Sequence, residues 1–155
     1  LVHFEQQAQN RRMRHIAPIA RVLLGLVFLV YAANYFVPFL PPQPPPPPEA
    51  MGFIVALVTS KLLTLVKLIE IAAAVALLTN RLVPLALALL APIVVGIVFF
   101  HVTLVPAGLP IAIGVLALEV VVAWSYRSSF APMLRAKAAP DPIAHRVRVP
   151  ALVVP

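Results

Sequence analysis

The chain has 155 residues, of which 62% are hydrophobic and 11% are charged. A soluble domain is typically about half apolar and about a quarter charged. A core of this size cannot hide so much apolar surface from water. The composition therefore argues against an ordinary soluble domain and predicts a single-domain integral membrane protein in a lipid bilayer. The chain has no cysteine, so we expect no thiol or iron–sulfur chemistry. We also expect no haem.

The formal net charge is +7, which raises the question of a nucleic-acid partner. Ten of the twelve Lys and Arg residues lie before residue 22, at residue 81, or from residue 127 onward. Nucleic-acid binders gather their bases on one face with aromatic partners, whereas here the bases stand at the ends of apolar runs, as topology signals do. We therefore expect no nucleic-acid partner. The predicted topology anchors are Arg11, Arg12, Arg14, Arg21, Arg81 and Arg127.

The first 16 residues form a basic segment, for which we predict a short interfacial helix. Pro18 then fits the first turn of a new helix, where proline is accepted. An apolar run of about 20 residues is long enough to span a bilayer, and the first span is predicted at about residues 19–39.

A proline-rich stretch over residues 38–49 follows and predicts a stiff polyproline spacer outside the bilayer. The next apolar segment, residues 51–60, is too short to span a bilayer. We interpret it as a short interfacial or re-entrant helix between spans 1 and 2.

Three further spans are predicted at about residues 62–79, 82–105 and 111–126. The fold class is thus an all-α membrane protein, a bundle of four transmembrane helices in a membrane domain of residues 17–127. Residues 128–155 form a basic, proline-containing tail, in which residues 145–150 alternate like an edge strand. The bases cluster with both termini and with the turn at Arg81, so the positive-inside rule predicts that both termini and the tail are cytoplasmic.

Five polar side chains within the predicted membrane domain are the candidate ligand-binding residues: Asn34, Lys67, Glu70, His101 and Glu119. Charges inside a bilayer face the bundle interior and pair with each other. Lys67 and Glu70 are three residues apart and hence neighbours on one helix face. One interpretation is structural: the pair neutralises itself, and the Asn and His bond across helices.

The alternative interpretation is an outward-facing polar pocket for a quinone headgroup or another small polar ligand. Lys67 and His101 would donate hydrogen bonds to it, and Glu70 or Glu119 would pass protons. A metal site is the weakest option, because nothing sets the spacing of the one His and two carboxylates. We interpret Gly96 and Gly114 as positions of close helix approach.

Several short motifs occur in a characteristic order: Lys67-Leu-Ile-Glu70, Asn80-Arg81-Leu-Val-Pro84, Ala91-Pro92 and Phe100-His101, after Arg21-Val-Leu-Leu-Gly25. Over residues 17–135 the chain resembles the DoxX-like family of small bacterial integral membrane proteins. The resemblance implies a compact four-helix membrane bundle in the bacterial cytoplasmic (inner) membrane. It also implies a link to sulfur-compound and quinone-coupled oxidoreductases, or a role as their membrane subunit.

Two functional hypotheses follow. The first is a non-catalytic, DoxX-like membrane subunit or anchor that packs against other subunits of a larger membrane complex, a redox complex among the options. The second is a quinone- or small-molecule-binding component of a membrane oxidoreductase, with quinone or lipid as its bound molecule. Transport is a weaker third option, because four short helices without an inverted repeat leave little room for alternating access.

Overall fold

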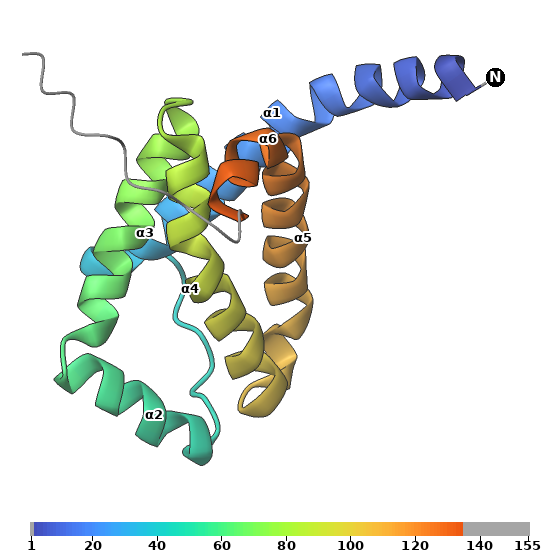
Figure 1. Cartoon of the computed structure of the whole chain (residues 1–155). Helices are drawn as coiled ribbons and strands as arrows, with labels where there is room; N and C mark the ends of the chain where they lie inside the picture. The colour runs from blue at the N-terminus through green and yellow to red at the C-terminus, as the bar shows by residue number, and fades with distance from the viewer. Residues whose placement is uncertain (1, 135–155) are drawn as a thin grey trace, which may run out of the picture.

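A computed structural model describes residues 2–134, with the side chains of residues 16–133, and these residues are all-helical apart from turns and loops (Figure 1). The predicted edge strand at residues 145–150 lies outside the described residues. In chain order the elements are α1 (Val2–Phe36), α2 (Pro48–Thr59), α3 (Leu62–Leu78), α4 (Val83–Thr103), η1 (Pro106–Gly108), α5 (Leu109–Ser125), α6 (Arg127–Phe130) and η2 (Ala131–Leu134).

Helix α1 is continuous over 35 residues and contains Pro18 in its interior. The predicted separate helix over residues 1–16, with Pro18 opening a new one, is therefore wrong. Residues 2–15 contain neither proline nor glycine, and they are rich in Gln and Arg, which favour helix. The helix ends at Phe36, because Pro38 disfavours a helical conformation in the residue before it.

Helix α2 confirms the predicted short helix between the first two long helices and begins three residues before the predicted segment. Pro48 occupies a first-turn position, where its missing amide proton costs no hydrogen bond. Glu49 lies in the same turn and favours this positive end of the helix dipole. With 12 residues, α2 is too short to cross a bilayer.

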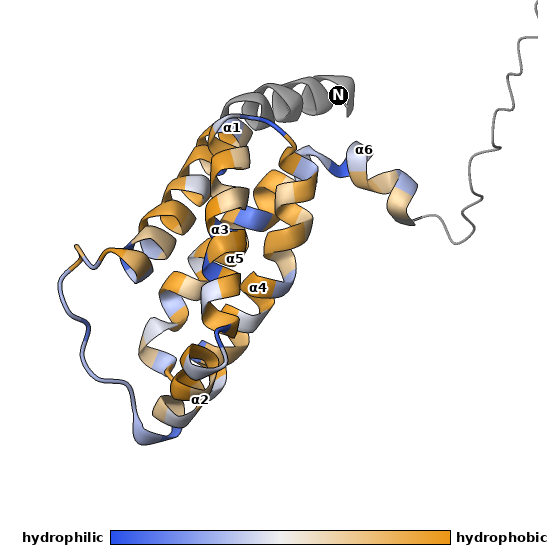
Figure 2. Ribbon diagram, turned by 90° about the vertical axis from the view of Figure 1, so that its left-hand side faces the viewer, coloured by the Kyte–Doolittle hydropathy of each residue, from blue (hydrophilic) through white to orange (hydrophobic). Residues whose placement is uncertain are grey.

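Helices α1, α3, α4 and α5 form a bundle in which α1 and α4 each pack against both α3 and α5 (Figure 2). Three segments are long and apolar enough to cross a membrane: Ile16–Phe36, Val83–Thr103 and Pro106–Ser125. By their length and composition these segments support a helical membrane protein, and they overlap three of the predicted spans. The fourth helix of the bundle, α3, has 17 residues.

The buried core is concentrated around the turn between α3 and α4, where Leu24, Leu77, Leu87, Leu90 and Val122 are fully buried. Asn80 and Leu82 adopt left-handed backbone conformations, which reverse the chain within this turn. The guanidinium of Arg21 donates a hydrogen bond to the Leu77 carbonyl. The Tyr126 hydroxyl donates one to the Asn80 side chain at 3.1 Å. These bonds join α1, α3 and the end of α5 at one end of the bundle, and α2 lies at the other (Figure 2).

Candidate functional site: a pocket between α2, α3 and α4

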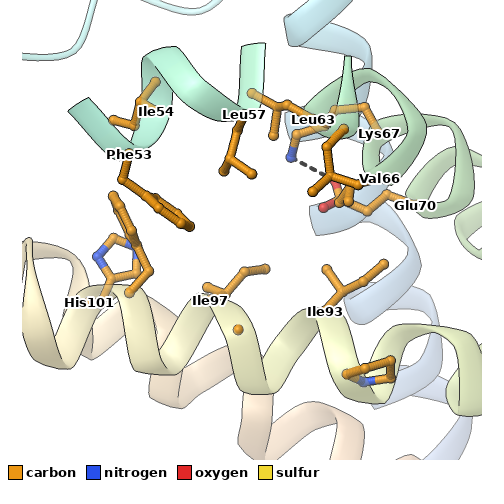
Figure 3. Close-up of a pocket in the computed structure, with 14 residues that line it drawn as sticks. Phe53, Ile54, Leu57, Leu63, Val66, Lys67, Glu70, Ile93, Ile97 and His101 are labelled. Carbon is orange, nitrogen blue, oxygen red and sulfur yellow. Dashed lines mark hydrogen bonds and ion pairs between the residues drawn. The ribbon is translucent and has the colours of Figure 1, made fainter. Parts of the chain in front are cut away.

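A pocket of about 600 Å³ lies between α2, α3 and α4 (Figure 3). Its lining is almost entirely apolar. The side chains that the close-up labels are Phe53, Ile54 and Leu57 from α2, Leu63, Val66, Lys67 and Glu70 from α3, and Ile93, Ile97 and His101 from α4. The structure thus brings three of the five predicted ligand-binding residues into one cavity.

Lys67 and Glu70 form an ion pair on the α3 wall of the pocket. The Lys67 Nζ donates to Glu70 Oε2 at 2.7 Å. The Glu70 side chain is 2% exposed and that of Lys67 is 19% exposed. Their spacing of three residues places both on one face of the helix, so the pair forms within a single element. The predicted pairing is confirmed, and it puts one charge of each sign beside an apolar cavity.

His101 lies on the other side of the pocket, beside Phe53 (Figure 3). Its Nδ1 lies 3.0 Å from the Val105 carbonyl oxygen. A carbonyl oxygen only accepts, so Nδ1 carries the hydrogen, and the Nε2 of a neutral ring is left as an acceptor. A Cβ at Gly108 would overlap the ring, so this glycine is required for the ring to sit as it does.

Asn34 and Glu119 do not line this pocket. The Asn34 Oδ1 accepts hydrogen bonds from the backbone amides of Phe39 and Leu40, both at 2.8 Å, and so stabilises the exit of the chain from α1. Glu119 is 6% exposed and faces the bundle interior from α5. Its Oε1 is buried without a hydrogen-bond partner among the described residues.

The α2 wall and Gly96 are the parts of the site that the sequence interpretation missed. Residues 53, 54 and 57 share one face of α2, a spacing that is visible in the sequence, but their partner helices are not. No atom lies within 4 Å of a Cβ built on Gly96 or Gly114. The interpretation of these two glycines as close-approach positions is therefore wrong, and the close approach occurs at Gly25, whose Cβ would lie 3.0 Å from Leu78 Cγ.

Among the described residues no group of three or more His, Cys, Asp or Glu side chains is placed to hold a metal ion. Comparisons of the chain with family models, curated proteins and solved structures found no match. The resemblance to the DoxX-like family therefore stays a prediction, carried by the motifs themselves.

Proposed function

We propose that the chain is a four-span integral membrane protein, with α3 as the fourth span. Helix α3 has 17 residues, which is the lower limit of about 17–25 for a transmembrane helix. It packs within the bundle beside α1 and α4. Its outward side chains are apolar and exposed, as Leu65 and Leu68 illustrate. Water would hydrate such a face poorly, and acyl chains would cover it.

The bundle has one basic end, which supports the proposed topology. Arg21, Arg81 and Arg127 all lie near the end that holds the α3–α4 turn, as the bonds from Arg21 and Tyr126 indicate. At the other end, Glu49 lies in the first turn of α2 and Lys61 follows its last turn, one charge of each sign. The positive-inside rule then puts the arginine end in the cytoplasm and the pocket towards the outer face of the inner membrane.

Within this membrane domain we propose a DoxX-like binding site for a lipid-soluble small molecule of the quinone class, acting in a larger membrane redox assembly. The pocket is the observation that carries the proposal. Its volume of about 600 Å³ is in the usual range of about 300–1,000 Å³ for small-molecule sites, which are mostly apolar with a few polar groups.

The polar groups suit a quinone head, which carries carbonyl groups when oxidised and hydroxyl groups when reduced. The Lys67 ammonium keeps donors beyond the one that it gives to Glu70, because it has three. It would donate to a carbonyl oxygen of the ligand. The Nε2 of His101, left as an acceptor by the bond to Val105, would accept from a hydroxyl of the reduced form. These are the two polar contacts that distinguish this pocket from a plain apolar void.

The test is a substitution that fills the pocket without disturbing the helix. Gly96→Leu introduces a side chain into open space, and Gly114→Leu does the same on an exposed face of α5. Both replace a helical glycine and gain similar helix propensity. With decyl-benzoquinone as probe, equilibrium dialysis against purified protein should show saturable binding to the parent and to Gly114→Leu. Binding to Gly96→Leu should be lost. Equal binding to all three proteins would refute the site.

A second candidate is a non-catalytic subunit or anchor, favoured by the length of α1. This helix begins at Val2, whereas its apolar, membrane-compatible part begins at Ile16. Its first part projects from the bundle (Figure 1) and would meet a partner subunit. Purification in mild detergent with mass spectrometry of co-purifying proteins tests this idea. A stable, ligand-free monomer would count against it.

A further inference from the structure

We propose that the pocket takes a neutral lipid with a long apolar chain, and that this lipid reaches the pocket sideways, between α2 and α4. The inference rests on the proposed binding function and narrows its ligand class and its path. Three features carry it: the charge of the pocket, the unequal packing of its three walls, and the apolar character of both faces of α2.

The charge of the pocket favours a neutral head. Glu70 already neutralises Lys67 at 2.7 Å. An anionic head would therefore bring an unpaired negative charge next to a buried carboxylate, which is costly in an apolar surrounding. A carbonyl or hydroxyl group only needs hydrogen bonds, which the lysine ammonium supplies. The alkyl chain of the same lipid would pack against the apolar side chains of Ile54, Leu57 and Ile97.

The three walls of the pocket are packed unequally. Helix α3 packs extensively against α4, and α2 packs against α3. Contact between α2 and α4 is more limited. These two helices meet at the rings of Phe53 and Phe100, whose centroids lie 5.9 Å apart with 30° between the ring planes. One aromatic contact can separate by rotation of two side chains, whereas an interdigitated helix pair cannot.

Both faces of α2 are apolar. Ile54 and Leu57 face the pocket, while Met51, Val55 and Val58 are exposed on the helix surface. In a membrane these exposed side chains would contact lipid. The pocket and the lipid are then separated by a single apolar helix, so a ligand passing beside it would not have to cross water. In Figure 1 the α2 helix runs across the end of the bundle rather than along it.

The attachment of α2 is compatible with small rotations. On one side it follows the proline-rich segment, and on the other it joins α3 through Ser60 and Lys61. Lys61 has φ of 62°, the left-handed region that non-glycine residues seldom occupy. The chain therefore turns sharply at one residue between the two helices. Movement about this residue would widen the gap at Phe53 while leaving the α3–α4 packing intact.

The test uses the absence of native cysteine. A double variant, Phe53→Cys with Phe100→Cys, is treated with a short bifunctional maleimide that cross-links α2 to α4. The matched control is the same variant treated with N-ethylmaleimide, which modifies both cysteines without joining them. Uptake from phosphatidylcholine vesicles is timed for two probes with the same head, decyl-benzoquinone and methyl-benzoquinone.

The cross-link should slow uptake of the decyl probe by about tenfold or more, in the range by which conformational restriction lowers association rates, and should change uptake of the methyl probe far less. Unchanged uptake of the decyl probe in the cross-linked protein overturns the sideways path. Equal slowing of both probes overturns the proposal that the alkyl chain of the lipid passes between α2 and α4. Loss of saturable binding to the parent chain, or insensitivity to Gly96→Leu, would instead refute the binding function itself.

The preference for a neutral head group is tested separately, by competition against the decyl probe at alkaline pH. Decanoate, an anion with a comparable chain, should displace the decyl probe about tenfold less well than decanol does, because the carboxylate would be buried without a free partner. Equal or better displacement by decanoate overturns the neutral head, whatever the outcome of the cross-linking.

Discussion

The two ends of the bundle are built differently. At the turn end, residues 70–94, the buried side chains of α3 and α4 interlock with α1 and α5. At the pocket end, residues 62–67 of α3 and 96–101 of α4, the side chains of the same two helices are half-buried or exposed, and a cavity beside α2 replaces the core. One pair of helices thus provides rigidity over half its length and a wall of the pocket over the other half. A cavity is tolerated at one end because the other end holds the helices in place.

The largest expected effect concerns Glu70, at the boundary between the two ends. Glu70→Leu leaves the ammonium of Lys67 without its partner and should lower the free energy of unfolding by about 3–5 kcal/mol. Glu119→Leu removes a buried carboxyl, one oxygen of which has no partner among the described side chains and backbone, and should be neutral or stabilising. Reversible unfolding in mixed micelles measures both. Changes of the same sign and size would show that the two carboxyls have equivalent surroundings.

Truncation of an apolar side chain should cost more stability at the turn end than at the pocket end. Leu90 is fully buried at the turn end, and Leu90→Ala should cost about 2–5 kcal/mol because it leaves a cavity among close neighbours. Ile97 already borders a cavity, so Ile97→Ala should cost less than half as much. Thermal unfolding in detergent compares them. A larger loss for Ile97 would mean that the pocket is filled and packed in the native protein.

A glycine pair sharpens the comparison further. Gly25→Leu would press a side chain against Leu78 and the Ala74 carbonyl, whose nearest atoms lie 3.0 Å and 3.3 Å from a Cβ at this position. The expected loss is about 1–3 kcal/mol from overpacking between α1 and α3. A Cβ at Gly114 has no atom within 4 Å, so Gly114→Leu serves as the control. If both variants unfold alike in the same micelles, α1 and α3 are not in close contact at Gly25.

The smallest expected effect is at Gly108. Gly108→Ala should displace the His101 ring and break its hydrogen bond to Val105, a change of about 1 kcal/mol in stability. The more direct readout is ¹⁵N NMR of the imidazole, in which the Nδ1–H tautomer of the parent should give way to a mixture. An unchanged tautomer would show that the hydrogen bond to Val105 does not determine the tautomer of the His101 ring. The conservative control, Gly52→Ala in α2, has open space at its Cβ.

Much of the architecture was predictable because lipid imposes a simple pattern. The apolar runs are punctuated by Pro38, by Asn80-Arg81 and by Pro106, and the helices end near each of them. The start of α1 was not predictable in this way. Its first residues are polar, which suggested a separate element, yet their helix propensity joins them to the apolar helix without a break.

The site was only partly predictable for a different reason. The Lys67–Glu70 pair follows from spacing along one helix, so the sequence alone indicates it. The partners of Asn34 and His101 are backbone groups in the following loops, and side-chain chemistry gives no sign of them. The α2 wall depends on how a short helix folds back against α3, which is a tertiary contact. Local patterns identify the polar groups, and only packing shows which of them share a cavity.

The tight reversal at Asn80 and Leu82 also bears on how the protein enters its membrane. On its own α3 is a poor candidate for insertion, because Lys67 and Glu70 would each oppose transfer into hydrocarbon by roughly 2.5–3.5 kcal/mol. Helix α4 follows after only four residues and carries no acidic residue, lysine or arginine. With α3 as the proposed fourth span, the two helices are suited to be integrated together as a helical hairpin, in which the strongly apolar α4 offsets the cost of inserting α3.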